Sequence, residues 1–277
     1  MNSYPEGFEE DHRLRSLFVR DLLRYELDGE LSPRDLRDSM EVTIPKTLIR
    51  YWHDESDVPD DVNDCLRSWD RLSTEGVVLQ MFNDTSAAAY IAQRYGIPEM
   101  TAFSRCRHPA MRCDYFRMCA LAWEGGLYVD ADDVLLGDDW KYLFHDAALK
   151  LQPLCYDILA AGMVPATEFW QRDAKTDERV FYVNNDPIAA PPGHPVLLRA
   201  LANSTEKLLC DDGLPEIQAT TGPGNLTAAL VAHARDLVNA NAPFDFELLK
   251  DWDAIAETRW HLSYRGDARN WRNMDHG

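Results

Sequence analysis

Short apolar runs typical of β-strands alternate along this chain with segments whose apolar residues have helical spacing. The strand-like runs cover residues 47–52, 77–82, 127–129, 154–159 and 179–183, and the helical segments cover 61–72, 86–95, 110–124 and 195–209. Such alternation is typical of a layered α/β domain with a mainly parallel central sheet flanked by helices. A chain of 277 residues, 45% of them hydrophobic, can bury the core of one large domain.

The N-terminal part precedes this alternation and is predicted to be helical. Residues 12–27 place apolar side chains at helical spacing, among them Leu14 and Phe18. Ser32-Pro33 then opens a short second helix, because a polar cap followed by proline is typical of a first helical turn. We therefore expect residues 1–42 to form a helical extension packed on a main domain of residues 43–277.

The charge balance disfavours two classes of partner. The chain has 28 Lys and Arg residues against 47 Asp and Glu residues, which gives a net charge of −19. A nucleic-acid binder that reads through a basic face, or a protein that docks on anionic lipid, is opposed by this charge. No apolar run is long enough for a transmembrane segment, and the first eleven residues lack the features of a secretory signal. The six cysteines form no C-x-x-C pair, so we expect reduced thiols and a cytoplasmic protein.

The most informative segment is an acidic cluster that follows a short apolar strand. Leu127-Tyr-Val129 delivers Asp130, Asp132 and Asp133 to the carboxyl end of that strand, where open α/β sheets bind ligands. Asp130 and Asp132 are two residues apart, so in extended geometry they point the same way and can hold one Mg²⁺ or Mn²⁺ ion. The other interpretation is a solvated acidic turn, which a chain this acidic also favours.

A charged pair lies on the helix just upstream. Asp114 and Arg117 are three residues apart and share one helical face, which borders the same predicted pocket. An ordinary intrahelical ion pair is the alternative interpretation.

Together these motifs resemble the DXD-containing sugar-nucleotide glycosyltransferases of glycosyltransferase family 32. That family includes yeast-type initiating mannosyltransferases, bacterial polysaccharide enzymes and, more distantly, glucosylating clostridial toxins. The likeness rests on an Asp-x-x-Arg helix (Asp114, Arg117), two glycines at 125–126, and the DXD of Asp130 and Asp132. Weaker matches lie around Ile44-Pro45-Lys46, Gly193-His194-Pro195 and Thr221-Gly222-Pro223.

The resemblance implies a GT-A-like fold and a metal-dependent, retaining transfer of a hexose. The donor is then a UDP- or GDP-linked sugar, the cofactor Mn²⁺ or Mg²⁺, and the acceptor a hydroxyl of a glycan, a lipid-linked oligosaccharide or a small natural product. Asp132 is expected to ligate the metal, together with Asp130, and His261 is the candidate for a further ligand. A metal held there neutralises charge on the departing diphosphate.

The resemblance also assigns roles to the residues around the metal. Asp130 is expected to bind sugar or ribose hydroxyls, and Asp114 and Arg117 the donor sugar. Asn185 is expected to face the reacting sugar or the acceptor. Trp52 is expected to contact the nucleotide base, although the residue pattern fits a core tryptophan equally well. No carboxylate nucleophile can be identified from the sequence, so we expect front-face substitution.

The same residues also fit other interpretations. The segment 127–136 also resembles the aspartyl-phosphate motif of haloacid-dehalogenase-like phosphatases, in which Asp130 would be the nucleophile and Asp132 the general acid; Asp211-Asp212 would supply a downstream acidic pair. A non-catalytic carbohydrate-binding protein of the same fold is a third possibility. The aromatic tail can form a lid over the donor or pack on the sheet; it comprises Trp252, Trp260, Tyr264 and Trp271.

Overall fold

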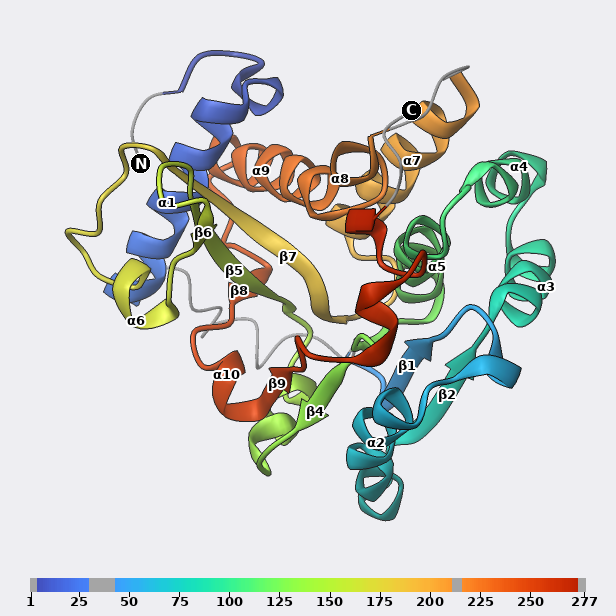
Figure 1. Cartoon of the computed structure of the whole chain (residues 1–277). Helices are drawn as coiled ribbons and strands as arrows, with labels where there is room; N and C mark the ends of the chain where they lie inside the picture. The colour runs from blue at the N-terminus through green and yellow to red at the C-terminus, as the bar shows by residue number, and fades with distance from the viewer. Residues whose placement is uncertain (1–3, 30–42, 211–215, 274–277) are drawn as a thin grey trace.

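A mixed seven-stranded sheet runs through the middle of the molecule (Figure 1). The computed structural model describes residues 4–29, 43–210 and 216–273, and the strand count refers to these residues. The strands are β1 (Thr47–Tyr51), β2 (Val78–Phe82), β3 (Gly126–Tyr128), β5 (Leu149–Asp157), β6 (Gly162–Met163), β7 (Arg179–Ala190) and β8 (Phe246–Leu248). Their order across the sheet is β2-β1-β3-β7-β5-β6, and β8 also pairs with β5.

Five of the seven strands run in one direction. Strand β1 is parallel to β2 and β3, and β5 is parallel to β8. Strand β7 is antiparallel to both β3 and β5, and β6 is antiparallel to β5. The predicted α/β class with a mainly parallel sheet is therefore confirmed, and β7 joins the two parallel parts as a reversed central strand.

Helices and short segments cover both faces of the sheet. The long helices are α1 (His12–Asp28), α5 (Pro109–Glu124), α7 (Pro195–Cys210) and α9 (Pro223–Asn239). The shorter elements are α2 (Asp60–Ser68), α3 (Asp84–Arg94), α4 (Ile97–Arg105), α6 (Ala166–Phe169), α8 (Ile217–Thr220), α10 (Trp252–Ile255) and the two-stranded pair β4 (Asp133–Leu135) and β9 (Ala256–Thr258).

Alternate residues of a strand enter different hydrophobic cores. Leu48 and Leu127 pack with Trp69 and Trp252 on one face. Ile49 packs on the other face, in the larger core to which the long helices contribute. This is the period of two expected for strands that are buried on both sides.

The predicted N-terminal helix is confirmed as α1. Its residues Phe18, Val19 and Leu22 are buried in the larger core, and the helix packs against β7. The second helix expected at Ser32-Pro33, and the expected boundary between residues 42 and 43, lie outside the described residues.

The other predicted elements are present with shifted ends. The helix predicted over 61–72 ends at Ser68 and is followed by a 3₁₀ segment. The strands predicted over 154–159 and 179–183 are parts of the longer β5 and β7. The sequence did not predict α9 or the β4–β9 pair.

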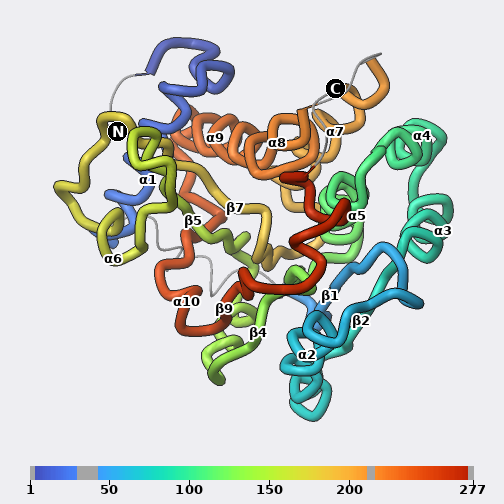
Figure 2. The backbone as a smooth tube through the Cα atoms, in the orientation of Figure 1, coloured from blue at the N-terminus to red at the C-terminus, as the bar shows by residue number. Residues whose placement is uncertain are grey.

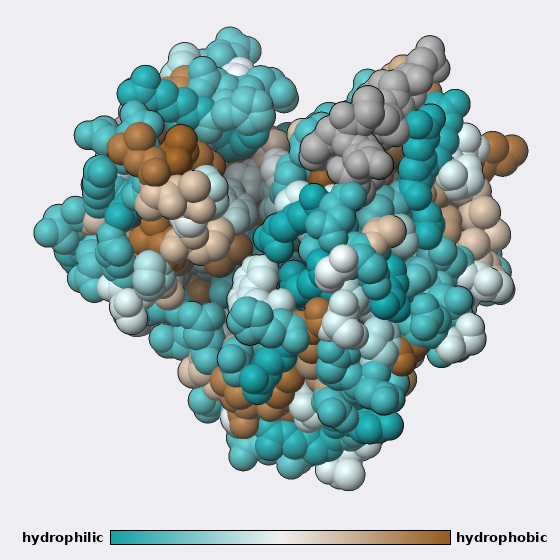
Figure 3. Space-filling view, in the orientation of Figure 1, coloured by the Kyte–Doolittle hydropathy of each residue, from teal (hydrophilic) through white to brown (hydrophobic). Residues whose placement is uncertain are grey.

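The molecular surface is largely hydrophilic in the view of Figure 3, in keeping with the net charge of −19. A hydrophobic patch lies over the β5–β6 hairpin, where Ile158, Leu159 and Met163 are exposed. Among the described helices, none combines the length and the apolar character that crossing a membrane requires.

Candidate active site

Two glycines let β3 run close to its neighbours and so place the acidic segment. Gly125 has φ +69°, and a Cβ there would lie 2.7 Å from the carbonyl oxygen of Ala190 and the nitrogen of Pro192. Gly126 has φ +117°, and its Cβ would lie 2.8 Å from the carbonyl oxygen of Thr47. Only glycine fits such approaches without displacing the backbone. Asp130 lies just beyond the carboxyl end of β3, between β1 and β7 in the sheet.

Asp130 is held on three sides by hydrogen bonds. Its Oδ1 accepts from Nη2 of Arg117 and from the hydroxyl of Tyr128, each at 2.9 Å. Its backbone N–H donates to Oδ1 of Asp186 at 2.9 Å. The side chain remains about one third exposed (32%), so it is fixed in position and still accessible to a ligand.

Arg117 connects Asp114, its predicted partner on the same helix, to the DXD segment. Its Nη2 lies 3.0 Å from Oδ1 of Asp114, and its guanidinium carbon lies 4.2 Å from the ring centre of Tyr128. It also donates to the carbonyl oxygen of Asn185. The arginine is buried, and an unpaired charge there would be costly, so the carboxylates on either side stabilise it.

Asp114 and Asn185 both contact this arginine and are hydrogen-bonded to each other. The amide of Asn185 donates to Oδ1 of Asp114 at 2.8 Å, and the hydroxyl of Thr221 donates to Oδ2 at 3.4 Å. Burial raises the pKa of Asp114 to about 7, although the charge of Arg117 opposes the rise. The structure thus brings together Asp114, Arg117, Asp130 and Asn185, from α5, the end of β3 and β7.

Asp132 faces the C-terminal segment instead of Arg117. Its Oδ2 accepts from the hydroxyl of Tyr264 at 2.7 Å and forms an ion pair with Arg265. Figure 2 shows this segment crossing the molecule from β9 toward α5. Trp52 lies beside it, buried against Ala131 and in edge-to-face contact with Tyr264 at 5.2 Å between ring centres. The two faces of the Trp52 ring are therefore not presented to solvent as an open stacking platform.

Two further aspartates were not among the predicted site residues. Asp133 is 1% exposed, and its carboxyl group lies close to the side chains of Thr258 and Asp186. Burial, reinforced by the charge of Asp132, raises its pKa to about 7. Burial, together with the charges of Asp133 and Asp130, also raises the pKa of Asp186. Asp133 belongs to the acidic run in the sequence, but no local signal marks Asp186, because it joins the site through the pairing of β7 with β3.

His261 is exposed and does not complete a compact metal site. Its ring does not form, with Asp130 and Asp132, a group whose ligand atoms all lie within 4.8 Å of one another. The sequence interpretation of His261 as a metal ligand therefore has no support from its position. The exposed ring follows the short β9 strand, and the sequence pattern does not fix its direction.

One triad in the described part of the chain does have such spacing, namely His194, His233 and Asp245. Nε2 of His233 lies 2.8 Å from Oδ1 of Asp245. The N–H of Val196 points to Nδ1 of His194 at 3.3 Å, which assigns the proton of a neutral ring to Nε2, 3.2 Å from the carbonyl oxygen of Asp245. A metal ion needs an unprotonated ring nitrogen, so this triad is a hydrogen-bonded clamp between α7, α9 and β8.

The aromatic tail divides between the core and the site. Trp252 is buried and stacks on Trp69 at 6.4 Å between ring centres. Trp260 is exposed, and the guanidinium of Arg265 lies 4.7 Å from its ring centre. Packing thus accounts for Trp252, whereas Tyr264 covers the DXD segment.

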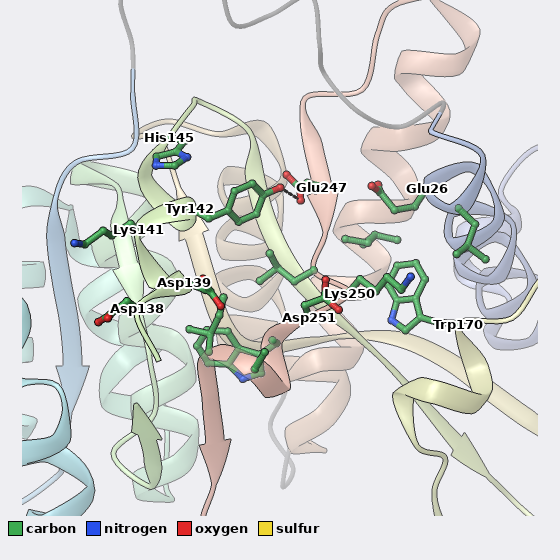
Figure 4. Close-up of a pocket in the computed structure, with 16 residues that line it drawn as sticks. Glu26, Asp138, Asp139, Lys141, Tyr142, His145, Trp170, Glu247, Lys250 and Asp251 are labelled. Atoms are coloured by element: carbon green, nitrogen blue, oxygen red, sulfur yellow. Dashed lines mark hydrogen bonds between the residues drawn. The ribbon is translucent and has the colours of Figure 1, made fainter. Parts of the chain in front are cut away.

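A cavity of about 650 Å³ lies away from the DXD segment, between α1, β8 and α10 (Figure 4). Its lining includes Glu26, Tyr142, Trp170 and Glu247, and none of the DXD aspartates. The hydroxyl of Tyr142 donates to Glu247. Burial, followed by the charge of Glu247, raises the pKa of Glu26 to about 7.

Comparison with known proteins agrees with this geometry. Residues 59–145 match the family described as "Glycosyltransferase sugar-binding region containing DXD motif". A solved structure titled "PaToxG Glycosyltransferase" is similar in fold, with a TM-score of 0.50, 15% sequence identity, and coverage of 82% of this chain and 84% of that chain. No curated protein matches the chain.

The matched region holds Asp114, Arg117, Asp130 and Asp132. Residues 59–145 are therefore similar to a glycosyltransferase sugar-binding region with a DXD motif, and the fold is one that a glycosyltransferase shares. The phosphatase alternative is not favoured: β3 is the third strand of the sheet along the chain, whereas the phosphatase motif belongs on the first strand. The acidic pair Asp211-Asp212 lies outside the described residues.

Proposed function

We propose that this protein is a glycosyltransferase of the family 32 type, which moves a hexose from a UDP- or GDP-sugar to a hydroxyl acceptor with retention of configuration. The observation that carries the proposal is the constellation of Arg117 between Asp114 and Asp130, with Asp132 two residues further along. This arrangement presents a fixed carboxylate, a partly exposed site and an acidic turn at the carboxyl end of β3.

The carboxylates fit a hard divalent cation. Asp133 is 1% exposed beside Asp132, and burial together with the charges of Asp132 and Asp130 raises its pKa, so negative charge at this turn is costly unless a positive charge lies close by. Mg²⁺ and Mn²⁺ take oxygen ligands of this kind. Asp132 and Asp130 would hold the ion, whose charge would stabilise the departing diphosphate.

The protein's own groups would orient the donor. Arg117 fixes Oδ1 of Asp130, which leaves the rest of that carboxylate for sugar or ribose hydroxyls. Asn185 is buried beside Asp114, so it would act by holding that carboxylate under the donor sugar. The acceptor hydroxyl would approach on the face from which the diphosphate leaves and pass its proton to the departing phosphate.

A donor screen tests this proposal. Purified protein with Mn²⁺ would be incubated with UDP-glucose, GDP-mannose and related donors, and the release of UDP or GDP measured beside a generic phosphatase assay. We expect one nucleotide sugar to be turned over and to raise the melting temperature. Phosphatase activity without any nucleotide-sugar turnover would contradict the proposal, and a trapped covalent glycosyl-enzyme would overturn the front-face mechanism.

A further inference from the structure

A C-terminal strap, defined here as residues 259–270, lies directly over the DXD segment. It leaves β9, which pairs with β4, and the N–H of Arg259 donates to the carbonyl oxygen of Asp132 at 2.9 Å. The strap is therefore anchored at the residue expected to bind the metal.

Two side chains of the strap, Tyr264 and Arg265, contact the same carboxylate oxygen of Asp132. Tyr264 donates to Oδ2 of Asp132, and Arg265 forms an ion pair with the same atom. The side chains of Arg265 and Asp132 are 15% and 11% exposed, so this pair is largely shielded from water. A guanidinium in this position supplies the positive charge that a divalent cation would otherwise bring to Oδ2.

Arg265 has unused capacity to bind an anion. Its Nε is buried and has no hydrogen-bond partner among the described residues. A guanidinium is always charged, and its planar fork matches the oxygens of a phosphate group. The guanidinium can therefore take a phosphate oxygen in exchange for the carboxylate.

Apolar packing and surface contacts hold the rest of the strap, and Leu262 and Tyr264 pack against the buried cluster that contains Trp52. Ser263 donates through its backbone N–H and its hydroxyl to Asp61, at 2.6 and 3.0 Å. The carbonyl oxygen of Ala268 lies 3.0 Å from Nε2 of His108, and Nη1 of Arg269 lies 3.2 Å from Oδ2 of Asp57. The contacts of Ser263 and Arg269 are exposed and contribute little to stability, so the side chain of Arg265 can move without opening of the fold.

We propose that Arg265 is a donor-positioning residue that neutralises Asp132 until the donor arrives. Asp132 then exchanges the guanidinium for the divalent cation, and Arg265 moves onto the diphosphate of the nucleotide sugar. The exchange conserves charge, because a divalent cation and a diphosphate with two negative charges enter together. The identity of the ligand in this inference rests on the proposed function. The competition between Arg265 and a divalent cation for Asp132 is independent of that function.

Two binding measurements on the full chain test the inference. Mn²⁺ binding would be followed by electron paramagnetic resonance without nucleotide, and the binding of UDP, GDP and inorganic pyrophosphate by calorimetry at saturating Mn²⁺. Arg265→Gln is expected to bind Mn²⁺ about tenfold more tightly, because the guanidinium no longer competes for Asp132. The same variant is expected to bind the diphosphates about tenfold more weakly, because a hydrogen bond to a charged group is lost. Arg265→Lys, which keeps the charge, is expected to retain part of the diphosphate affinity.

Arg259→Gln is the matched control. Arg259 lies on the same strap, is about half exposed and pairs with Glu257, so neither affinity should change. Mn²⁺ affinity that is the same in Arg265→Gln and the wild type would overturn the exchange at Asp132. Diphosphate affinity that is the same in both would overturn the positioning role. If the wild-type protein bound Mn²⁺ but no diphosphate, the proposed function and the positioning role would fail, while the Mn²⁺ comparison would still decide the exchange.

Discussion

Gly125 offers the sharpest test of how the candidate site is built. Its backbone has φ +69° and ψ −169°, a region that is essentially restricted to glycine, and its missing side chain leaves room for two backbone atoms at 2.7 Å. Gly125→Ala should therefore destabilise the protein through both effects. Backbone strain contributes about 1–3 kcal/mol. Displacement of the packed backbone contributes about 1–3 kcal/mol more, so we expect a loss of about 2–6 kcal/mol in the free energy of unfolding.

Two other glycines separate these contributions. Gly76 has φ +83° and nothing within 4 Å of a Cβ, so Gly76→Ala isolates the cost of a left-handed conformation, about 1–2 kcal/mol. Gly137 has no positive φ, and the nearest atom to a Cβ lies at 3.4 Å, so Gly137→Ala should change the free energy of unfolding by less than about 0.5 kcal/mol. Urea denaturation at pH 7, followed by circular dichroism, measures all three. A Gly125→Ala loss no larger than that of Gly76→Ala would refute the close approach between β3 and β7.

The remaining predictions concern single carboxylates. Asp132→Ala should abolish donor hydrolysis while circular dichroism shows a retained fold, and unaltered hydrolysis would remove the metal assignment. The control Asp138→Ala, at an exposed position on the cavity away from the DXD segment, should leave turnover unchanged. Asp245→Asn should lower the free energy of unfolding at pH 7 by about 1–3 kcal/mol. Burial acts to raise the pKa of Asp245, but interactions with His194 and His233 outweigh it and hold that pKa well below its usual range. That stabilisation is present above the unfolded pKa near 4 and is lost at lower pH, so the difference in urea midpoint between wild type and variant should shrink in acid. Glu26 has the opposite effect: because its pKa is raised to about 7, the wild type should lose stability as the pH rises from about 4.5 to 7. Glu26→Gln should remove this decrease of the free energy of unfolding with pH, and an unchanged decrease would count against burial of this carboxyl.

Local spacing accounts for the part of the site that the sequence predicted. Asp114 and Arg117 are three residues apart on one helix, so their shared face follows from helical geometry alone. The placement of Asp130 after β3 follows from an apolar run bounded by two glycines. These features need no knowledge of distant pairing, and the structure brings all three residues into contact.

The rest depends on contacts between residues far apart in the chain. Tyr264 and Arg265 reach Asp132 across more than 130 residues because β4 pairs with β9, and two strands of three residues carry too little pattern to be predicted. The reversed direction of β7 was missed for a related reason. The apolar alternation stops at Val183, and the polar run of Asn184, Asn185 and Asp186 hides the second half of the strand.

The central position of β7 limits how this molecule can change over evolutionary time. The strand pairs with β3 on one side and β5 on the other, and its middle carries the groups that hold Asp114 and Asp130. A mutation that altered these groups would disturb sheet pairing along with chemistry, so selection acting on stability also preserves the donor pocket. New ligand preferences can arise more freely in the strap, where the exposed contacts of Ser263 and Arg269 can be replaced one at a time while the sheet stays intact.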